Sequence, residues 1–250
     1  LLKDANAVVR ESAEDYVLKS VKELQVKQTH AVTILNSAGD EFSTVVIPYN
    51  PNTKVSSIKV EVYDAAGKLS KTYSKKDFND YTNNPSAALY VDDRILVLRP
   101  MSSQYPYTVK SYYETTTSNT VYLNYFRPVT SYDMAVQKST FTVLNSSGIN
   151  VRTKITDRPL AKLTHSTEGN LMKYSYENIP ALKHEDLAPS ISYLVPQVEF
   201  SPEKFTLEGK EGNMTDWNSF GKWYYSQLIN PVSEITPEIR AEVQALDRKS

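Results

Sequence analysis

The chain has 250 residues, of which 40% are apolar and 23% charged, a composition typical of one or two folded domains and not of a disordered segment. Its 28 Lys and Arg residues balance 29 Asp and Glu residues, and the net charge of −1 argues against nucleic acid or anionic lipid as the partner of the surface as a whole. Cysteine is absent, which excludes disulfides, thiolate metal sites and a cysteine nucleophile within this chain.

The sequence contains no run of the roughly 18 apolar residues that a membrane-spanning helix requires. It opens at Leu1 without the charged and apolar segments of a signal peptide, so we expect any export signal to lie upstream. The lack of cysteine also fits an oxidising compartment.

Apolar and polar residues alternate through most of the first 200 residues. In Ile58–Val62 the aliphatic side chains share one face and the charged side chains the other, as a half-buried strand requires. The same period of two recurs in Phe141–Val143 and Ile149–Ile155, and it places Tyr105, Tyr107, Val109 and Tyr113 on one side of another strand. Strands with one polar face favour antiparallel sheets over a buried parallel sheet.

Turn signals separate these strands at short intervals, at Asn36–Asp40, Asp64–Lys68 and Thr167–Asn170. Counting the runs between such signals gives about a dozen strands, more than a small immunoglobulin-like sandwich contains. We therefore predict an all-β fold, a large antiparallel two-sheet β-sandwich over residues 1–200, followed by short C-terminal helices.

The pattern changes near Ser201, because Ser201-Pro202 and the Gly209–Gly212 stretch interrupt the alternation. A helical period follows, with an N-cap at Thr215 or Asp216, and a second helix is expected to begin at Thr236-Pro237. We predict that residues 201–250 form a helical linker. The apolar positions of the two helices are Trp217, Phe220, Tyr224 and Leu228 in the first, and Ile239, Val243 and Leu246 in the second.

Trp217 and Trp223 are six positions apart, about 600° around a helix, and so fall on different faces. One of them can pack on the sandwich while the other faces a following domain. The expected interdomain or partner contacts are Trp217, Phe220, Trp223 and Tyr224.

Candidates for chemistry are few. His30, His165 and His184 are far apart and lack the spacing of metal ligands. His30 shares a face with Val26 and Val32, which favours a hydrogen-bonded structural histidine over a catalytic one; half of a buried pair is the alternative.

Adjacent carboxylates occur at Asp92-Asp93-Arg94, between the apolar runs Leu89–Val91 and Ile95–Leu98. Neighbours on a strand point to opposite faces, so the two aspartates are poorly placed to act together as acid and base, and they are too few for a calcium site. We expect a turn or bulge in which an aspartate caps backbone amides and Arg94 pairs across strands.

Tyrosine is unusually abundant, with 18 residues. Exposed tyrosines can stack on sugar rings or anchor a protein partner, so Tyr105, Tyr107, Tyr112 and Tyr113 form a possible ligand surface, with a second cluster at Tyr122 and Tyr125. Because tyrosine is also a common strand residue, core and cross-strand packing is the favoured interpretation.

No nucleophile elbow, phosphate-binding glycine loop, zinc-protease helix or dinucleotide fingerprint is present. The sequence therefore predicts no catalytic residue, no cofactor-binding residue and no metal ligand.

An ordered set of motifs nevertheless resembles the N-terminal β-sandwich domain, a domain of unknown function, of exported transglutaminase-like proteins common in Bacteroidetes. The motifs are Asp4–Val9, Ile34–Gly39, Asp92–Arg94, Tyr105–Val109, Asn178–Leu182 and Trp217–Tyr224. In such proteins a Cys-His-Asp transglutaminase core follows the tryptophan-containing helix. The resemblance implies a large antiparallel sandwich in a periplasmic or extracellular setting. It also implies that the chain ends before that core and presents or positions its substrate.

Three functions are open from sequence alone. The leading one is a non-catalytic interaction module of an exported transglutaminase-like protein, a possible peptidase, with the C-terminal catalytic domain as its partner. The alternative is a carbohydrate-binding module that uses surface tyrosines, with a glycan or protein ligand. A hydrolase built on His30 or His184 and nearby carboxylates is disfavoured, because no nucleophile, base and orienting group can be assembled.

Overall fold

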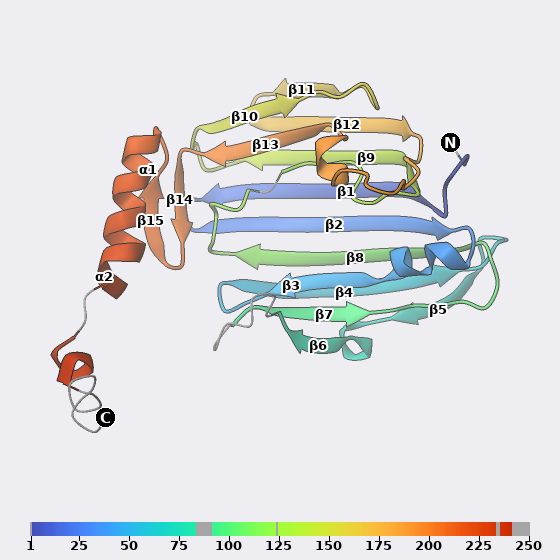
Figure 1. Cartoon of the computed structure of the whole chain (residues 1–250), viewed down its shortest axis with the longest axis horizontal. Coiled ribbons are helices and arrows are strands. Elements are labelled where there is room, and N and C mark those ends of the chain that lie inside the picture. Colours follow the sequence, from blue (N-terminus) through green and yellow to red (C-terminus); the bar gives the residue numbers. More distant parts are fainter. Residues whose placement is uncertain (1, 84–91, 124, 234–235, 242–250) are drawn as a thin grey trace.

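An eight-stranded sheet forms the body of the molecule in the computed structural model (Figure 1). The structure describes residues 2–83, 92–123, 125–233 and 236–241. The strand order of this main sheet is β11-β12-β9-β1-β2-β8-β4-β5. Its strands are β1 (Ala7–Ser20), β2 (Glu23–Ile34), β4 (Thr53–Tyr63), β5 (Leu69–Tyr73), β8 (Tyr107–Thr117), β9 (Met134–Asn145), β11 (Thr164–Glu168) and β12 (Leu171–Ile179).

Two small sheets cover the inner face of the main sheet. One contains β3 (Val45–Tyr49), β7 (Arg94–Leu98) and β6 (Asn79–Thr82) in that order, and the other pairs β10 (Val151–Thr156) with β13 (Gln197–Pro202). Phe126 extends the second sheet through a bridge to Val198, with N···O distances of 2.7 and 2.9 Å. The covering layer is thus split into two parts on the same face, one over the β12–β9 end of the main sheet and one over its β4–β5 end (Figure 1).

The structure confirms the predicted all-β, sandwich-like fold with short C-terminal helices. Most strand pairs are antiparallel, but β1 and β9 pair in parallel, so the main sheet is mixed and not wholly antiparallel. Parallel neighbours need a long connection. Here residues 35–133, which include β3 to β8, lie between β2 and β9, and β9 then pairs with the edge of β1 that β2 leaves free.

Aromatic rings fill the core beneath the β10–β13 sheet. Phe141 of β9 is fully buried and stacks on Tyr16, Phe126 and Phe200 with ring centroids 4.7, 5.4 and 4.8 Å apart. These contacts join two strands of the main sheet to the covering layer. Every second residue of these strands faces inward and contributes to this core, as the period of two predicts.

The expected turns are present. Asp64–Lys68 closes the β4–β5 hairpin and Thr167–Asn170 the β11–β12 hairpin, each with a glycine at positive φ. Asn36 caps a short 3-10 helix, η1 (Ser37–Ser43), where the sequence indicated a turn. Two further 3-10 segments are η2 (Lys75–Asp77) and η3 (Ile191–Tyr193).

Residues 201–213 are not a helical linker. β13 crosses the expected boundary at residue 200, and β14 (Lys204–Leu207) and β15 (Lys210–Asn213) form a hairpin. Glu208 and Gly209, with φ of 48° and 74°, make its two-residue turn, so the glycine that seemed to end the strand pattern closes a hairpin.

Helical structure begins with α1 (Trp217–Tyr224) and continues through a π-helical turn, η4 (Tyr225–Ile229), into α2 (Asn230–Ser233). Thr236 then starts the second expected helix, which is helical at residues 237–241, whereas Val243 and Leu246 lie outside the described residues. Within the described ranges, no helix is long and apolar enough to cross a membrane.

Candidate functional site

The aromatic helix α1 lies beyond one end of the main sheet, next to the β14–β15 hairpin (Figure 1). Asp216 caps it by accepting a hydrogen bond of 2.7 Å from the Ser219 amide. The structure brings the four predicted contact residues together around Phe220, whose ring centroid lies 6.2 Å from Trp217, 5.9 Å from Trp223 and 6.0 Å from Tyr224.

The two tryptophans of α1 have different environments. Trp223 meets the buried Phe205 edge to face at 4.8 Å, and its Nε1 donates to the Glu211 backbone oxygen at 2.7 Å. Trp217 is 86% exposed. One tryptophan therefore fixes the helix to the hairpin and the other presents its ring to solvent.

The hairpin is in turn held against the sandwich. The Thr206 amide donates to Thr120 Oγ1 at 2.9 Å, and Thr120 donates to the Val21 backbone oxygen in the β1–β2 turn at 2.6 Å. The Glu208 carboxylate accepts from Asn119 at 2.6 Å and from Asn52 at 2.8 Å. Helix α1 is thus connected to the main sheet through the β14–β15 hairpin, whose polar contacts lie at the end of the sheet.

Replacement of Gly212 by alanine is expected to destabilise the protein by about 1–3 kcal/mol. A Cβ atom there would lie 2.5 Å from the Phe205 ring and 2.8 Å from the Trp223 ring. Gly221→Ala is the control, because a Cβ in this helix meets nothing within 4 Å, and it should leave stability unchanged or raise it by up to about 1 kcal/mol. Urea unfolding of both variants measures the difference; equal losses would show that Trp223 does not pack on Gly212.

The four tyrosines proposed as a ligand surface do not lie on one surface. Tyr107 is 1% exposed, and it shares the Asp40 carboxylate with Tyr105 at 3.0 and 2.7 Å. Tyr113 points to the inner face of β8, whereas Tyr112 lies on the outer face, where it donates to Glu114. Burial raises the pKa of Tyr107 to about 12. These positions give no continuous platform for a sugar ring.

Polar side chains gather instead at the centre of the inner face, on β1, β2 and β8. Glu14 Oε2 accepts from Gln28 Nε2 at 3.3 Å and from the Tyr16 hydroxyl at 3.3 Å, while the Tyr113 hydroxyl donates to Gln28 Oε1. The strand registers place His30 beside this group, because Gln28 pairs with Glu14 and His30 pairs with Ser12. We call Glu14, Gln28, His30 and Tyr113 the central polar cluster.

Burial shifts the titration of this cluster. It raises the pKa of Glu14 to about 7, and the hydrogen bond from Tyr16 only partly opposes the shift. Burial lowers the pKa of His30 to about 4 and raises that of the Tyr113 hydroxyl. Near neutral pH, Glu14 is therefore partly protonated and His30 is neutral.

The split in the covering layer leaves two cavities over this cluster, and both are lined by Gln28 and His30. One, of about 150 Å³, lies beside the start of β3 and includes Tyr113. The other, of about 190 Å³, includes Glu14 and reaches Arg127 on the segment before β9. The central polar cluster therefore borders both cavities, with Tyr113 in one and Glu14 in the other.

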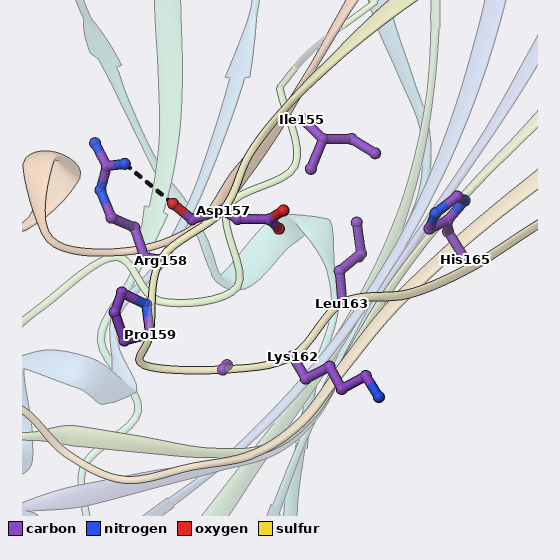
Figure 2. Close-up of a pocket in the computed structure, with 8 residues that line it drawn as sticks. Ile155, Asp157, Arg158, Pro159, Lys162, Leu163 and His165 are labelled. Atoms are coloured by element: carbon purple, nitrogen blue, oxygen red, sulfur yellow. Dashed lines mark hydrogen bonds between the residues drawn. The ribbon is translucent and has the colours of Figure 1, made fainter.

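A larger cavity of about 530 Å³ lies at the edge of the molecule, next to β10 and the edge strand β11. Figure 2 shows Ile155 and Leu163 facing its middle, while Lys162 points outward and Arg158 turns away to donate to the backbone oxygen of Asp157. Its polar groups do not converge on a common point, so it lacks the arrangement of a catalytic centre.

The remaining sequence candidates have structural partners. His165 stacks on Tyr174 at 6.0 Å, and the His184 ring meets Tyr132 at 5.2 Å. Arg94 pairs across strands with Asp80 at 3.0 Å, as expected. The run Leu89–Val91 before it lies outside the described residues.

Among the described residues, the Asp93 carboxylate accepts a hydrogen bond of 3.0 Å from the Asn50 side chain. In the described part of the chain, no three His, Asp or Glu side chains lie close enough to hold a metal ion.

Glu14 and Arg127 were missed by sequence reasoning. A signal for Glu14 was available, because it has the same parity as Tyr16 and Leu18 and so places a carboxyl on the buried face of its strand. Arg127 lies in a segment without strand periodicity, and no pattern connects it to β1.

A family model for a domain of unknown function with solved structures, DUF3857, matches residues 22–183 of this chain. No curated protein matches it. A putative protease from Parabacteroides distasonis has a similar structure, with a TM-score of 0.62 at 16% identity over 78% of this chain and 40% of that one. This likeness shows a shared fold, and the chain spans less than half the length of that protein.

Two further solved structures resemble the chain only weakly. An M1 zinc metallopeptidase mutant from Deinococcus radiodurans gives a TM-score of 0.35 at 10% identity over 83% of this chain and 46% of that one. A putative nutrient-binding protein from Legionella pneumophila gives 0.33 at 11% identity over 95% and 78%. At these scores neither structure informs the function of this chain.

Proposed function

Because this chain belongs to the DUF3857 family, a family of domains of unknown function, we propose that it is a non-catalytic module that binds a further domain of the same protein through helix α1. The observation that carries the proposal is the 86% exposed ring of Trp217 on a helix otherwise fixed to the sandwich. Large aromatic side chains held rigidly at a surface are typical centres of protein interfaces.

The exposed aromatic patch consists of Trp217 and Tyr224 of α1 and Tyr225 of η4. Tyr224 is 44% exposed and Tyr225 is 60% exposed. The contacts of Phe220 with Trp217, Trp223 and Tyr224 orient the patch before any partner binds. A preorganised patch loses little conformational entropy on association, which favours a stable contact.

The similarity to a longer protein supports the same proposal. The putative protease from Parabacteroides distasonis matches this chain over only 40% of its own length, so that protein has further regions beyond the shared sandwich. We propose that the partner domain here is transglutaminase-like, that the whole protein is exported, and that the sandwich positions the catalytic domain or its substrate.

The accessibility of Trp217 tests the contact directly. Within the 250 residues, a Trp223→Phe variant leaves Trp217 as the only tryptophan. Acrylamide quenching of its fluorescence is measured in this chain and in the chain extended by what its gene encodes after Ser250, with any tryptophan of the extension replaced by phenylalanine. We expect ready quenching in the chain alone and at least threefold lower quenching in the extended protein. The matched Trp217→Phe variant, which retains Trp223, should show little change. Equal quenching of Trp217 in both proteins would refute the contact.

A further inference from the structure

The cavity over Glu14 contains two opposite charges that do not neutralise each other. Glu14 and Arg127 both line it, yet none of the ion pairs among the described residues includes either side chain. Among the described residues, the Glu14 carboxylate accepts hydrogen bonds from two neutral groups, the Gln28 amide and the Tyr16 hydroxyl. A buried carboxyl without a cation is costly to ionise.

Arg127 is also incompletely paired. Its Nη2 donates to Gln197 at 2.9 Å and its guanidinium lies over the Tyr125 ring at 4.6 Å. Its Nε is buried and has no acceptor among the described residues. Buried N–H groups are rarely left unpaired, and a bound water, a bound ion or a functional role is among the explanations when one is.

The size of the cavity limits what can satisfy both groups. Its volume of about 190 Å³ corresponds to about six water molecules at roughly 30 Å³ each. This is enough for a molecule of six to ten or so heavy atoms and too little for a sugar chain or a folded partner. Gln28 and His30 add an amide and a neutral imidazole to the wall.

We propose that this cavity binds a free α-amino acid, with its ammonium group at the Glu14 carboxylate and its carboxylate at the Arg127 guanidinium. The occupant supplies a cation for Glu14 and an anion for Arg127, neither of which has an ion-pair partner among the described residues. The inference stands apart from the interdomain contact of α1, which lies at the end of the sheet, and either can fail without the other.

The protonation of Glu14 should make binding at this site depend on pH. Its pKa of about 7 means that near neutral pH an ammonium group must displace a proton from part of the population. The groups facing Glu14 are Tyr16, Tyr113, His30 and Arg127, and His30 is neutral at this pH. Binding should therefore release protons at pH 7 and weaken about tenfold from pH 8 to pH 6.

Calorimetry with each of the common L-α-amino acids at pH 8 tests the proposal. We expect at least one small amino acid to bind, and ethylamine and acetate, which each carry one of its two charges, to bind at least tenfold more weakly. Glu14→Gln and Arg127→Gln should each weaken binding at least tenfold. Glu11→Gln is the matched control, since Glu11 is exposed on the outer face of the same strand and should leave affinity unchanged.

Circular dichroism establishes that the variants are folded, and Arg127→Lys provides a second variant that keeps the charge if Arg127→Gln unfolds; it should bind more weakly than the parent. Binding by none of the amino acids would overturn the proposal. So would equal affinity for ethylamine or acetate, or undiminished binding by a folded Glu14→Gln protein.

Discussion

Truncation of Phe141 to alanine is expected to lower the free energy of unfolding by about 3–5 kcal/mol, which is a large part of the stability of an ordinary domain. The Phe141 ring is fully buried and stacks on three aromatic rings, one from β1, one from β13 and Phe126. Its loss leaves a cavity at the junction of the main sheet and the covering layer, where close-packed rings cannot all move to fill it.

Urea unfolding followed by fluorescence measures this effect. Tyr122→Ala is the control, because Tyr122 is 63% exposed and its truncation should change stability by less than about 0.5 kcal/mol. A loss below about 1 kcal/mol for Phe141→Ala would mean that the β10–β13 sheet does not pack on β9.

Glu14 and His30 are expected to give opposite dependences of stability on pH. The folded-state pKa of Glu14 is raised from 4.5 to about 7, so its contribution to stability is full below pH 4.5 and is lost as pH rises through 7. The folded-state pKa of His30 is lowered from 6.5 to about 4, so its contribution is full above pH 6.5 and is lost as pH falls through 4. Each group contributes about 2 kcal/mol, allowing for its half-buried position.

Single substitutions should separate the two contributions. Without the carboxyl, Glu14→Gln is expected to gain about 2 kcal/mol relative to the parent at pH 8 and to lose stability on acidification from pH 6.5 to 4. His30→Gln should lose about 2 kcal/mol relative to its own value at pH 4.5 as pH rises to 7. Urea unfolding at half-unit pH steps gives the four curves, including the double variant as reference. Parallel curves for all four proteins would show that neither group titrates abnormally.

The sequence was sufficient for most strands and turns of the sandwich, because one buried face imposes a period of two and glycine-containing turn motifs separate the strands. It also located α1 through the cap at Asp216 and the spacing of Trp217 and Phe220. It did not predict the parallel pairing of β1 with β9, which depends on where a strand returns after residues 35–133. Local patterns carry no information about that return.

The β14–β15 hairpin was missed for a different reason. Gly209 was read as an interruption, although Glu208-Gly209 is a favourable two-residue turn between strands of only four residues each. Strands this short show too little alternation to be recognised without their partner.

Half of the candidate site was accessible to sequence reasoning. The helical period identified the aromatic side chains of α1 and indicated that its two tryptophans face different ways. The central polar cluster was not identified, because it forms only where Glu14, Gln28 and Tyr113 meet across β1, β2 and β8. The four clustered tyrosines were grouped by their proximity in sequence, and the alternation of faces along β8 separates Tyr112 from Tyr113.

We propose that this chain assists a catalytic domain and is not itself an enzyme. The most direct test is to assay amide hydrolysis and amide transfer by this chain and by the same chain extended by what its gene encodes after Ser250. We expect activity in the extended protein alone, and we expect the Trp217→Ala substitution to reduce that activity. Hydrolysis or transfer by the isolated chain would contradict it.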